Sequence, residues 1–566
     1  MTPREDLAIV IAGEAGQGIQ AIESMLAAFA KRAKLHVFAT KEYMSRIRGG
    51  CNSTELRLSR RPVSARIDRV DILVALTKSA VAHLGSRIGA ATMVIGEKII
   101  VGHEGMLDIP FASIAAGLGG AIYANTVAVG ALCSLLGMDR ASSEGGLRDF
   151  FAKKGPAVVE ANLAAFAKGY ERGAAVQPRL PIELGADPAV AEEIMLTGAE
   201  AVAFGASAAG CDFVCAYPMS PGTSVLTAMA GMSERLGILV EQVEDELGAA
   251  NMALGAWYAG ARALVTTSGG GFALMGEAVS LSGAIETPLV VHIAQRPGPA
   301  TGLPTRTEQG DLNLAIHAGH GDFPRVVLAP GDLEEGFSLA RLAFEIADRY
   351  QSPVFILTDQ YYVDSYYTTP AFAVPPVIPS RAIVETAKDY RRYALGSPDG
   401  ISPRGVPGLG EGIVCVDSDE HDEGGYITED PAMRRSMVEK RLSKAEALRK
   451  DILPPHLHGS DNYEILVVGW GSVKMPILEA LALLGRPEIA YLHFPWVFPL
   501  PPQARDYVGK AKLVIAIEGN ATGQFADLLE FETGIRIPHR LLKYDGSQYA
   551  VEELAERISA LAPRKA

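Results

Sequence analysis

The sequence predicts an α/β protein made of three parallel-sheet layers and one less regular segment. Three observations support this fold class. The chain has 566 residues, which is enough for roughly three or four domains. Its composition, with 48% hydrophobic and 21% charged residues, is that of an ordinary globular protein. Three apolar blocks each alternate short buried strands with helical patterns, which is typical of parallel sheets.

Charge and cysteine content exclude several functions. The 52 Lys and Arg residues against 66 Asp and Glu residues leave a net charge of −14, which argues against nucleic-acid binding through a basic surface. The five cysteines contain no C-x-x-C pair, so we expect no zinc or iron–sulfur cage within this chain. Their odd number indicates a reducing compartment, and we expect a cytoplasmic protein.

Neither a signal peptide nor a membrane span is expected. The N-terminus carries acidic residues and no apolar region of the signal type. Residues 110–138 contain no charged residue and are long enough to span a bilayer. However, they include Ser113, Asn125, Thr126 and several glycines, and they lack flanking Lys/Arg clusters. We therefore interpret this stretch as a buried helix after a glycine-rich turn.

The first apolar block covers residues 1–176. A strand at 7–12 runs into Gly13-Glu-Ala-Gly-Gln-Gly18 and then into a helical pattern at 19–31. In this geometry backbone N–H groups and a helix N-terminus can face an anion, but G-x-x-G-x-G is not the dinucleotide fingerprint. The turn is equally typical of a phosphate cradle and of a simple tight turn. Further strands, expected to complete a doubly wound layer, lie at 72–76, 92–95 and 98–101.

The second block, residues 189–367, places polar groups where strands end. The strand expected at 213–216 ends in a loop with two prolines and several hydroxyl side chains, Tyr217-Pro-Met-Ser-Pro-Gly-Thr-Ser224. The strand expected at 263–268 runs into three glycines, Gly269–Gly271, which let a flat ring or another subunit approach the backbone. Ligands of open α/β sheets bind at these carboxyl ends of the strands.

Charged residues follow two other strands of this block. The strand at 288–293 leads into a long loop with Arg296 and Arg306, whose guanidinium forks suit a carboxylate. The strand at 238–243 leads into Glu244-Asp-Glu246 at the start of a helix. Acidic residues at this position match the helix dipole. We assign this dipole explanation to Glu244 and Asp245. For Glu246 it remains an alternative to a functional role.

Two segments are less regular than the blocks. Residues 177–188 contain three prolines and predict a linker. Residues 368–458, here called the arm, are rich in proline and glycine, then acidic, and end in an amphipathic helical pattern at 434–450. The apolar positions of that pattern are Met437, Val438, Leu442, Ala445 and Leu448. We interpret the arm as an extended element lying over a partner subunit. Strand and helix patterns resume in the third block, residues 459–566.

Taken in order, these motifs resemble the alpha subunit of 2-oxoacid:ferredoxin oxidoreductases with the family's gamma domain fused at the N-terminus. The loop Tyr217–Ser224 matches the family's Y-P-I-T-P-S-T loop, and Glu246–Ala250 matches its acid-small-small element. The turn Thr267–Phe272 matches its T-S-G-P-G-F turn, and Arg296–Thr305 matches its R-x-G-P-x-T-G-x-P-T segment. In the gamma domain, Gly13–Gly18 matches the family's G-x-G-G-Q-G turn and Arg48–Gly50 matches its R-G-G element. Two later segments, Asp419–Asp430 and Glu518–Gln524, also match the family. The departures are Ala15 at a family glycine, Met219-Ser220 for Ile-Thr and Gly270 for proline.

The resemblance implies a thiamine-diphosphate enzyme that decarboxylates a 2-oxoacid, passes electrons to ferredoxin and transfers the acyl group to coenzyme A. It assigns the three layers to a gamma domain, a thiamine pyrimidine-binding domain and a transketolase C-terminal-like domain. The sequence contains no Gly-Asp-Gly motif, by which thiamine enzymes hold Mg²⁺ and the diphosphate. The resemblance therefore implies a beta subunit that carries this half of the site and the iron–sulfur cluster, in an (αβ)2 assembly, with no metal on this chain.

The resemblance also implies roles for individual residues. Glu246 would be the catalytic carboxyl that hydrogen-bonds the aminopyrimidine ring, with Glu244 as the fallback. The cofactor site would be completed by Tyr217, Pro218, Gly269 and Gly270. The groups expected on the substrate carboxylate are Ser220, Thr223, Arg306 as first choice and Arg296 as second. The residues expected on coenzyme A are Gly16, Gly18, Arg46 and Arg48, although a purely structural role for this glycine turn is almost as well supported.

Several alternatives stay open at this point. We prefer 2-oxoglutarate as substrate because fused gamma–alpha chains with such an arm resemble that subgroup. Pyruvate, branched-chain and aryl 2-oxoacids are the other candidates, and the direction of flux is left open. Two readings from other classes remain: a nicotinamide-dependent dehydrogenase, suggested by the first glycine turn, and a non-catalytic scaffold subunit, suggested by the missing Gly-Asp-Gly motif.

Overall fold

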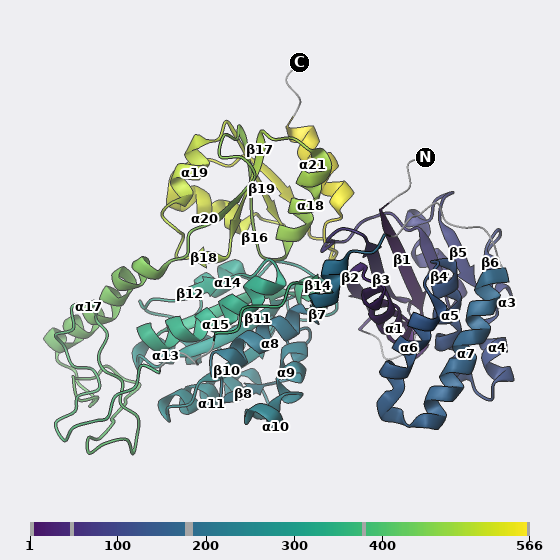
Figure 1. Ribbon diagram of the computed structural model, residues 1–566. Helices are drawn as coiled ribbons and strands as arrows, with labels where there is room; N and C mark the ends of the chain where they lie inside the picture. The colour runs from purple at the N-terminus through teal and green to yellow at the C-terminus, as the bar shows by residue number, and fades with distance from the viewer. Residues whose placement is uncertain (1–4, 46–49, 176–184, 376–380, 563–566) are drawn as a thin grey trace. The chain divides into compact units, whose positions relative to one another are not determined.

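The computed structural model describes residues 5–45, 50–175, 185–375 and 381–562. They form an α/β protein with several largely parallel sheets, which confirms the predicted fold class. The chain divides into two compact units (Figure 1). Unit 1 comprises residues 1–196 with 365–371 and 550–553, and unit 2 comprises 197–364, 372–549 and 554–566.

Unit 1 contains an eight-stranded mixed sheet. In spatial order its strands are β6 (Leu107–Asp108), β5 (Met93–Gly96), β4 (Ile72–Ala75), β1 (Asp6–Gly13), β3 (Asn52–Ser59), β2 (His36–Glu42), β14 (Tyr366–Thr369) and β7 (Ile194–Thr197). The run from β1 to β6 is parallel, as expected for a doubly wound layer. The hairpin of β2 and β3 and the added strand β14 pair antiparallel, so half of this sheet departs from the parallel pattern.

One predicted strand of unit 1 is wrong. Residues Lys98–Val101 form the short helix α3 rather than a strand. The N–H groups of Ile100 and Val101 both donate to the carbonyl of Glu97, and Gly102 ends the helix in the left-handed conformation. The side chain of Ile99 is 92% exposed. Three apolar residues in a row, Ile99–Val101, are compatible with either element, and the glycine that ends the turn decides for the helix.

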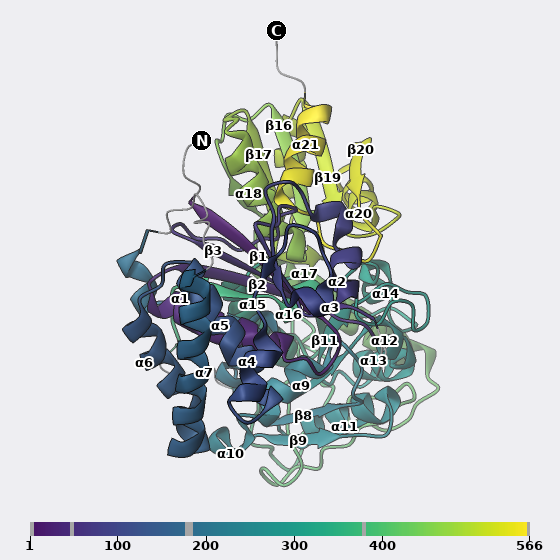
Figure 2. The same cartoon turned by 90° about the vertical axis from the view of Figure 1, so that its right-hand side faces the viewer.

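The uncharged stretch 110–138 forms two helices, α4 (Phe111–Gly117) and α5 (Ala124–Leu135). Helix α5 lies side by side with α7 (Pro156–Ala175) in both views (Figure 1 and Figure 2). A Cβ atom on Gly130 would overlap the carbonyl of Phe166, and one on Gly169 would overlap the carbonyl of Val127. The glycines therefore allow the two helix backbones to touch. Within the residues that the structure describes, no helix combines the length and apolar character that crossing a bilayer requires.

We expect Gly169→Val to destabilise unit 1 by about 1–3 kcal/mol, because the new side chain must push α7 away from the backbone of α5. Gly117→Ala is the matched control, because a Cβ atom there meets nothing within 4 Å. Chemical unfolding followed by circular dichroism measures both variants. Equal unfolding midpoints would contradict the close helix contact.

Unit 2 contains a seven-stranded sheet and a five-stranded sheet. The first has the order β18 (Trp496–Phe498), β12 (Val326–Leu328), β13 (Pro353–Asp359), β11 (Leu289–Gln295), β10 (Ala263–Thr267), β8 (Phe213–Ala216) and β9 (Leu239–Gln242). The second has the order β15 (His456–His458), β17 (Ile489–Phe494), β16 (Ile465–Trp470), β19 (Leu513–Glu518) and β20 (His539–Leu542). Only the edge strands β18 and β15 run antiparallel to their neighbours. One hydrophobic core joins both sheets through residues such as Val327, Phe494 and Trp496.

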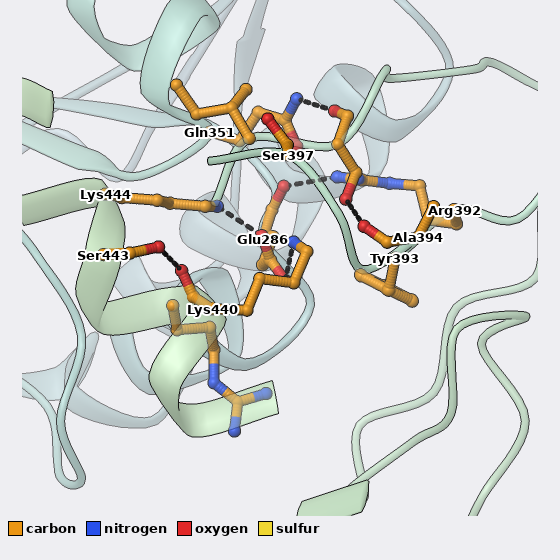
Figure 3. Close-up of polar contacts among 12 residues, drawn as sticks. Glu286, Gln351, Arg392, Tyr393, Ala394, Ser397, Lys440, Ser443 and Lys444 are labelled. Carbon is orange, nitrogen blue, oxygen red and sulfur yellow. Dashed lines mark hydrogen bonds and ion pairs between the residues drawn. The ribbon is translucent and has the colours of Figure 1, made fainter. Parts of the chain in front are cut away.

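From Phe372 onward, the described part of the arm belongs to unit 2. Its helix α17 (Pro431–Leu448) carries two lysines that point at the buried carboxyl of Glu286 (Figure 3). The Nζ atom of Lys440 lies 2.7 Å from a Glu286 oxygen, and Lys444 forms a second ion pair with the same carboxyl. Arg392 donates to the main-chain oxygen of Glu286 at 2.5 Å. The predicted apolar face is only partly buried, since Leu442 is 43% exposed while both lysines are buried.

Candidate active site

The candidate site begins with the three acids after β9. Asp245 caps helix α11 (Glu246–Tyr258) by accepting a hydrogen bond from the N–H of Gly248 at 2.6 Å. Asp245 and Glu244 are exposed to solvent, as expected of residues that serve the start of a helix. Glu246 differs from both because its side chain turns inward and the residue is 3% exposed. Helix-start charge matching therefore accounts for Asp245 but not for the burial of Glu246.

The Glu246 carboxyl lies against the glycine turn that follows β10. A Cβ atom on Gly271 would lie 2.5 Å from Glu246 Oε1, so only glycine leaves room for the carboxyl. Oε1 is buried and has no hydrogen-bond partner among the described residues. Burying a carboxylate oxygen without a partner costs free energy, so this atom is suited to accept or share a proton with a bound group.

We expect Gly271→Ala to displace the Glu246 carboxyl and lower any activity that depends on it by at least about tenfold, without unfolding the protein. Gly276→Ala, five residues further along, is the control, because a Cβ atom there meets nothing within 4 Å. Steady-state kinetics of both variants, with thermal melting as a check on folding, measures the difference. Full activity of Gly271→Ala would contradict the close contact between the Glu246 carboxyl and the glycine turn.

The two predicted arginines lie in different surroundings. Arg296 directly follows β11, and its Nη1 donates to the carbonyl of Ser220 at 2.6 Å. Burial lowers the pKa of Arg296, while the charges of Asp311 and Glu246 oppose that shift. Arg306 instead lies beside Gly546, where an added Cβ atom would be 3.1 Å from Arg306 Cβ. Arg296, predicted as the second choice, is thus the arginine that the structure brings to Ser220 and Glu246.

The loop after β8 approaches the same place. Gly222 lies so close to β10 that a Cβ atom there would be 2.6 Å from the Thr267 carbonyl oxygen. Tyr217 is 41% exposed. The other predicted residues of this loop are the exposed Ser220, the half-buried Pro218 and Thr223, the latter at the start of α9 (Thr223–Ala230). Because β8, β10 and β11 are parallel neighbours, their carboxyl ends bring these groups together.

The predicted glycines Gly269 and Gly270 open helix α12 (Gly269–Leu274). A Cβ atom on Gly270 would meet only the Ala300 carbonyl oxygen, at 3.6 Å, so its outer side is open. A Cβ atom on Gly269 would overlap the carboxyl group of Asp311. Sequence reasoning missed Asp311 and Ser268, whose Oδ2 and Oγ atoms are also buried without a hydrogen-bond partner in the described ranges.

The predicted coenzyme A residues lie in unit 1. Gly18 begins α1 (Ile19–Arg32) with φ 76°, and a Cβ atom there would overlap the side chain of Asn125. Gly16 is exposed with φ 89° and has nothing within 4 Å of a Cβ position. Arg46 and Arg48 lie outside the described residues. The turn therefore requires glycine for its backbone, whether or not it also binds a phosphate.

Other features of the described residues lie away from Glu246. The described residues contain no group of three or more His, Cys, Asp and Glu side chains arranged to hold a metal ion. A cavity of about 940 Å³ lies between α17, the segment after β18 and α20 (Gln524–Thr533). None of the predicted site residues lines it.

Two family models match parts of the chain. Residues 204–440 match the thiamine diphosphate-binding family of pyruvate flavodoxin/ferredoxin oxidoreductases, and residues 8–172 match the pyruvate ferredoxin/flavodoxin oxidoreductase family. These family matches place the chain in the class of thiamine diphosphate-binding oxidoreductases.

Individual relatives narrow the class. The alpha subunit of 2-oxoacid:ferredoxin oxidoreductase 1 from Aeropyrum pernix is 34% identical, over 77% of this chain and 70% of that protein. The 2-oxoglutarate oxidoreductase subunit KorA from Mycobacterium tuberculosis is 28% identical, over 99% and 92%. The structure of 2-oxoglutarate:ferredoxin oxidoreductase from Magnetococcus marinus, with 2-oxoglutarate, coenzyme A and succinyl-CoA bound, matches with TM-score 0.91 and 30% identity, over 98% of this chain and 99% of that chain. The chain belongs to the 2-oxoacid:ferredoxin oxidoreductase alpha-subunit family.

Proposed function

We propose that this chain is the alpha subunit, with a fused gamma domain, of a cytoplasmic CoA-acylating 2-oxoacid:ferredoxin oxidoreductase. Its substrate is 2-oxoglutarate, which it converts to succinyl-CoA with electrons passing to ferredoxin, in either direction of flux. The match to KorA over nearly the whole chain supports this substrate, as does the match to an oxidoreductase structure with 2-oxoglutarate bound. We also propose residues 1–176 as the gamma domain, 189–367 as the pyrimidine-binding domain and 459–566 as the transketolase C-terminal-like domain.

The observation that carries the proposal is the buried, unpartnered Oε1 atom of Glu246 beside a glycine turn. A carboxyl in that position fits the aminopyrimidine ring of thiamine diphosphate, whose ring nitrogen needs a hydrogen-bonding acid. When bound, the cofactor supplies the carbon nucleophile and electron sink that 2-oxoacid decarboxylation needs. Glu246 holds a proton at that ring nitrogen. Gly269, Gly270 with its open outer side, Tyr217 and Pro218 form the walls of the site.

The substrate carboxylate is oriented by cationic and hydroxyl groups. Arg296, with the hydroxyls of Ser220 and Thr223, binds the carboxylate next to the 2-oxo group, because Arg296 is the arginine that lies beside Ser220. Arg306 follows on the same loop and would receive a second carboxylate.

The proposal requires a partner subunit. The sequence lacks the Gly-Asp-Gly motif that holds Mg²⁺ and diphosphate, and the relatives are named as one subunit of a larger enzyme. We propose a beta subunit that carries the diphosphate site, Mg²⁺ and the iron–sulfur cluster, in an (αβ)2 assembly. The arm is the element proposed to contact it, and the residues 16, 18, 46 and 48 are proposed to meet coenzyme A.

The test is a substrate panel with the assembled enzyme. The chain is purified with its native partner subunit, and ferredoxin or viologen reduction is measured with coenzyme A and one 2-oxoacid at a time. We expect the highest kcat/KM with 2-oxoglutarate, and succinyl-CoA as the product by mass spectrometry. A higher kcat/KM with pyruvate, a branched-chain or an aryl 2-oxoacid would identify that compound as the substrate in place of 2-oxoglutarate. Absence of turnover with every 2-oxoacid would overturn the function.

A further inference from the structure

The glycine turn after β10 has a carboxyl group against each end. Glu246 lies against Gly271, and Asp311 lies so close to Gly269 that any Cβ atom there would overlap its carboxyl group. Both carboxyls contain a buried oxygen without a hydrogen-bond partner among the described residues, Oε1 of Glu246 and Oδ2 of Asp311. The second acid belongs to none of the motifs by which the site was predicted.

The backbone of Asp311 is held in place by the sheet. Its N–H donates to Oε1 of Gln295 at 3.0 Å, and Gln295 Nε2 in turn donates to the carbonyl of Thr358 at 2.9 Å. The Asp311 carbonyl accepts from the N–H of Ala315, at the start of α14 (Leu312–Ile316). Gln295 is the last residue of β11 and is fully buried, so Asp311 is anchored to the strand end that precedes Arg296.

Arg296 lies within the electrostatic influence of both carboxyls. The charges of Asp311 and Glu246 both act on Arg296, whose Nη1 is occupied by the Ser220 carbonyl. Its Nε atom is buried and lacks a hydrogen-bond partner in the described part of the chain. Burial and, after it, the charge of Asp311 raise the pKa of Glu308 on the same loop. Helices α12 and α14, which flank Asp311, contain no charged residue. The group thus holds more negative than positive charge before any substrate arrives.

We propose that Asp311 is a positioning residue whose carboxyl takes up a proton from solvent when a carboxylate substrate binds beside Arg296, so that substrate binding is coupled to proton uptake. This inference rests on the proposed function. A third carboxylate beside a single guanidinium, in a partly desolvated site, is stabilised if one of the resident acids becomes neutral. The neutral Asp311 then leaves Arg296 to the substrate.

Asp311 is the resident acid best suited to this exchange. Burial raises its pKa to about 6, against the opposing charge of Arg296. A substrate carboxylate nearby raises that pKa further, so the complex binds more protons than the free enzyme at neutral pH. Substrate affinity therefore decreases as pH rises above the pKa of the free enzyme, because the proton must be supplied from an increasingly dilute source.

The pH dependence of KM in the assembled enzyme tests this coupling. Between pH 6.5 and 8 we expect the wild-type KM for 2-oxoglutarate to rise by roughly tenfold. In Asp311→Asn, which keeps the shape but cannot ionise, we expect KM to change by less than about twofold over the same pH range. Glu308→Gln is the matched control, since it removes a neighbouring acid of the same loop and should keep the wild-type profile.

Isothermal titration provides a second readout that does not depend on turnover. The complex freed of thiamine diphosphate is titrated with 2-oxoglutarate in two buffers of different ionisation enthalpy. We expect proton uptake on binding in the wild type and Glu308→Gln, and loss of that uptake in Asp311→Asn. A wild-type pH profile or unchanged proton uptake in Asp311→Asn would overturn the inference alone, while lack of oxoacid turnover in the wild type would overturn the proposed function.

Discussion

Replacing Glu246 by glutamine in the assembled enzyme is expected to lower oxoacid-dependent ferredoxin reduction by about 100- to 10,000-fold. Glutamine fills the same space against Gly271, so the fold should stay intact. It cannot, however, exchange a proton with a ring nitrogen, which is the role proposed for the buried Oε1 atom. Pre-steady-state reduction of the iron–sulfur cluster proposed for the partner subunit, after mixing with 2-oxoglutarate and coenzyme A, measures the chemical step directly.

Glu244→Gln is the matched control. The two acids are two positions apart, but Glu244 is exposed and Glu246 is buried. The control should keep activity within about twofold, since an exposed residue at a helix start contributes mainly a few tenths of a kcal/mol through the dipole. Activity of Glu246→Gln above about one tenth of wild type would contradict a proton-holding role. It would also favour the scaffold reading of the chain.

Local pattern was sufficient to place the strands that build the site, but not to choose among the acids. The strand at 213–216 coincides with β8, and the one at 263–268 overlaps β10, because apolar runs between turn residues are short and sharply bounded. Glu244 and Glu246 look alike in sequence. Glu246 is the acid that lies against Gly271, and no local pattern indicates this contact because the two residues are distant in sequence.

The same limit applies to the arginines and to Asp311. Arg296 and Arg306 share one loop, and composition cannot rank them. The ranking comes from the Ser220 carbonyl, which β8 brings to Arg296 from the neighbouring strand end. Asp311 carries no motif that would distinguish it from a helix-start residue. Its significance depends on the absence of a side chain at Gly269, which only the folded chain reveals.

Helix α17 shows why hydrophobic periodicity misled in the arm. The pattern placed Leu442 on the inner face together with Met437 and Leu448, and these last two are indeed buried. Lys440 and Lys444 are buried as well, while Leu442 is 43% exposed. Lysine is seldom buried unless it is paired. Here the counter-ion is Glu286, more than 150 positions earlier in the chain, so no local pattern could indicate it.

Glu286→Gln is expected to destabilise the attachment of the arm by about 3–5 kcal/mol, because it leaves the buried Lys440 and Lys444 without their anion. Although burial alone would raise the pKa of Glu286, the charges of Lys444, Lys440 and Arg392 lower it to about 2. The folded state thus favours the charged carboxylate, and its contribution to stability is fully present above the ordinary pKa of 4.5. The difference between wild type and variant should shrink as pH falls below that value.

Lys444→Met is the matched control within the same cluster. Burial lowers the pKa of Lys444 to about 7 despite the nearby Glu286 charge, so its ammonium form is costly in the folded state. Removing it leaves the Glu286–Lys440 pair intact, and we expect a change of less than about 1 kcal/mol. Between pH 7 and 10.5 the Lys444 amine is protonated in the unfolded chain but mostly neutral in the folded protein. The free energy of unfolding of the wild type should therefore rise with pH in this range. The rise should be smaller in Lys444→Met. Thermal unfolding combined with limited proteolysis of residues 381–430 measures both variants, and equal losses in the two would show that the carboxyl is not the anchor of the arm.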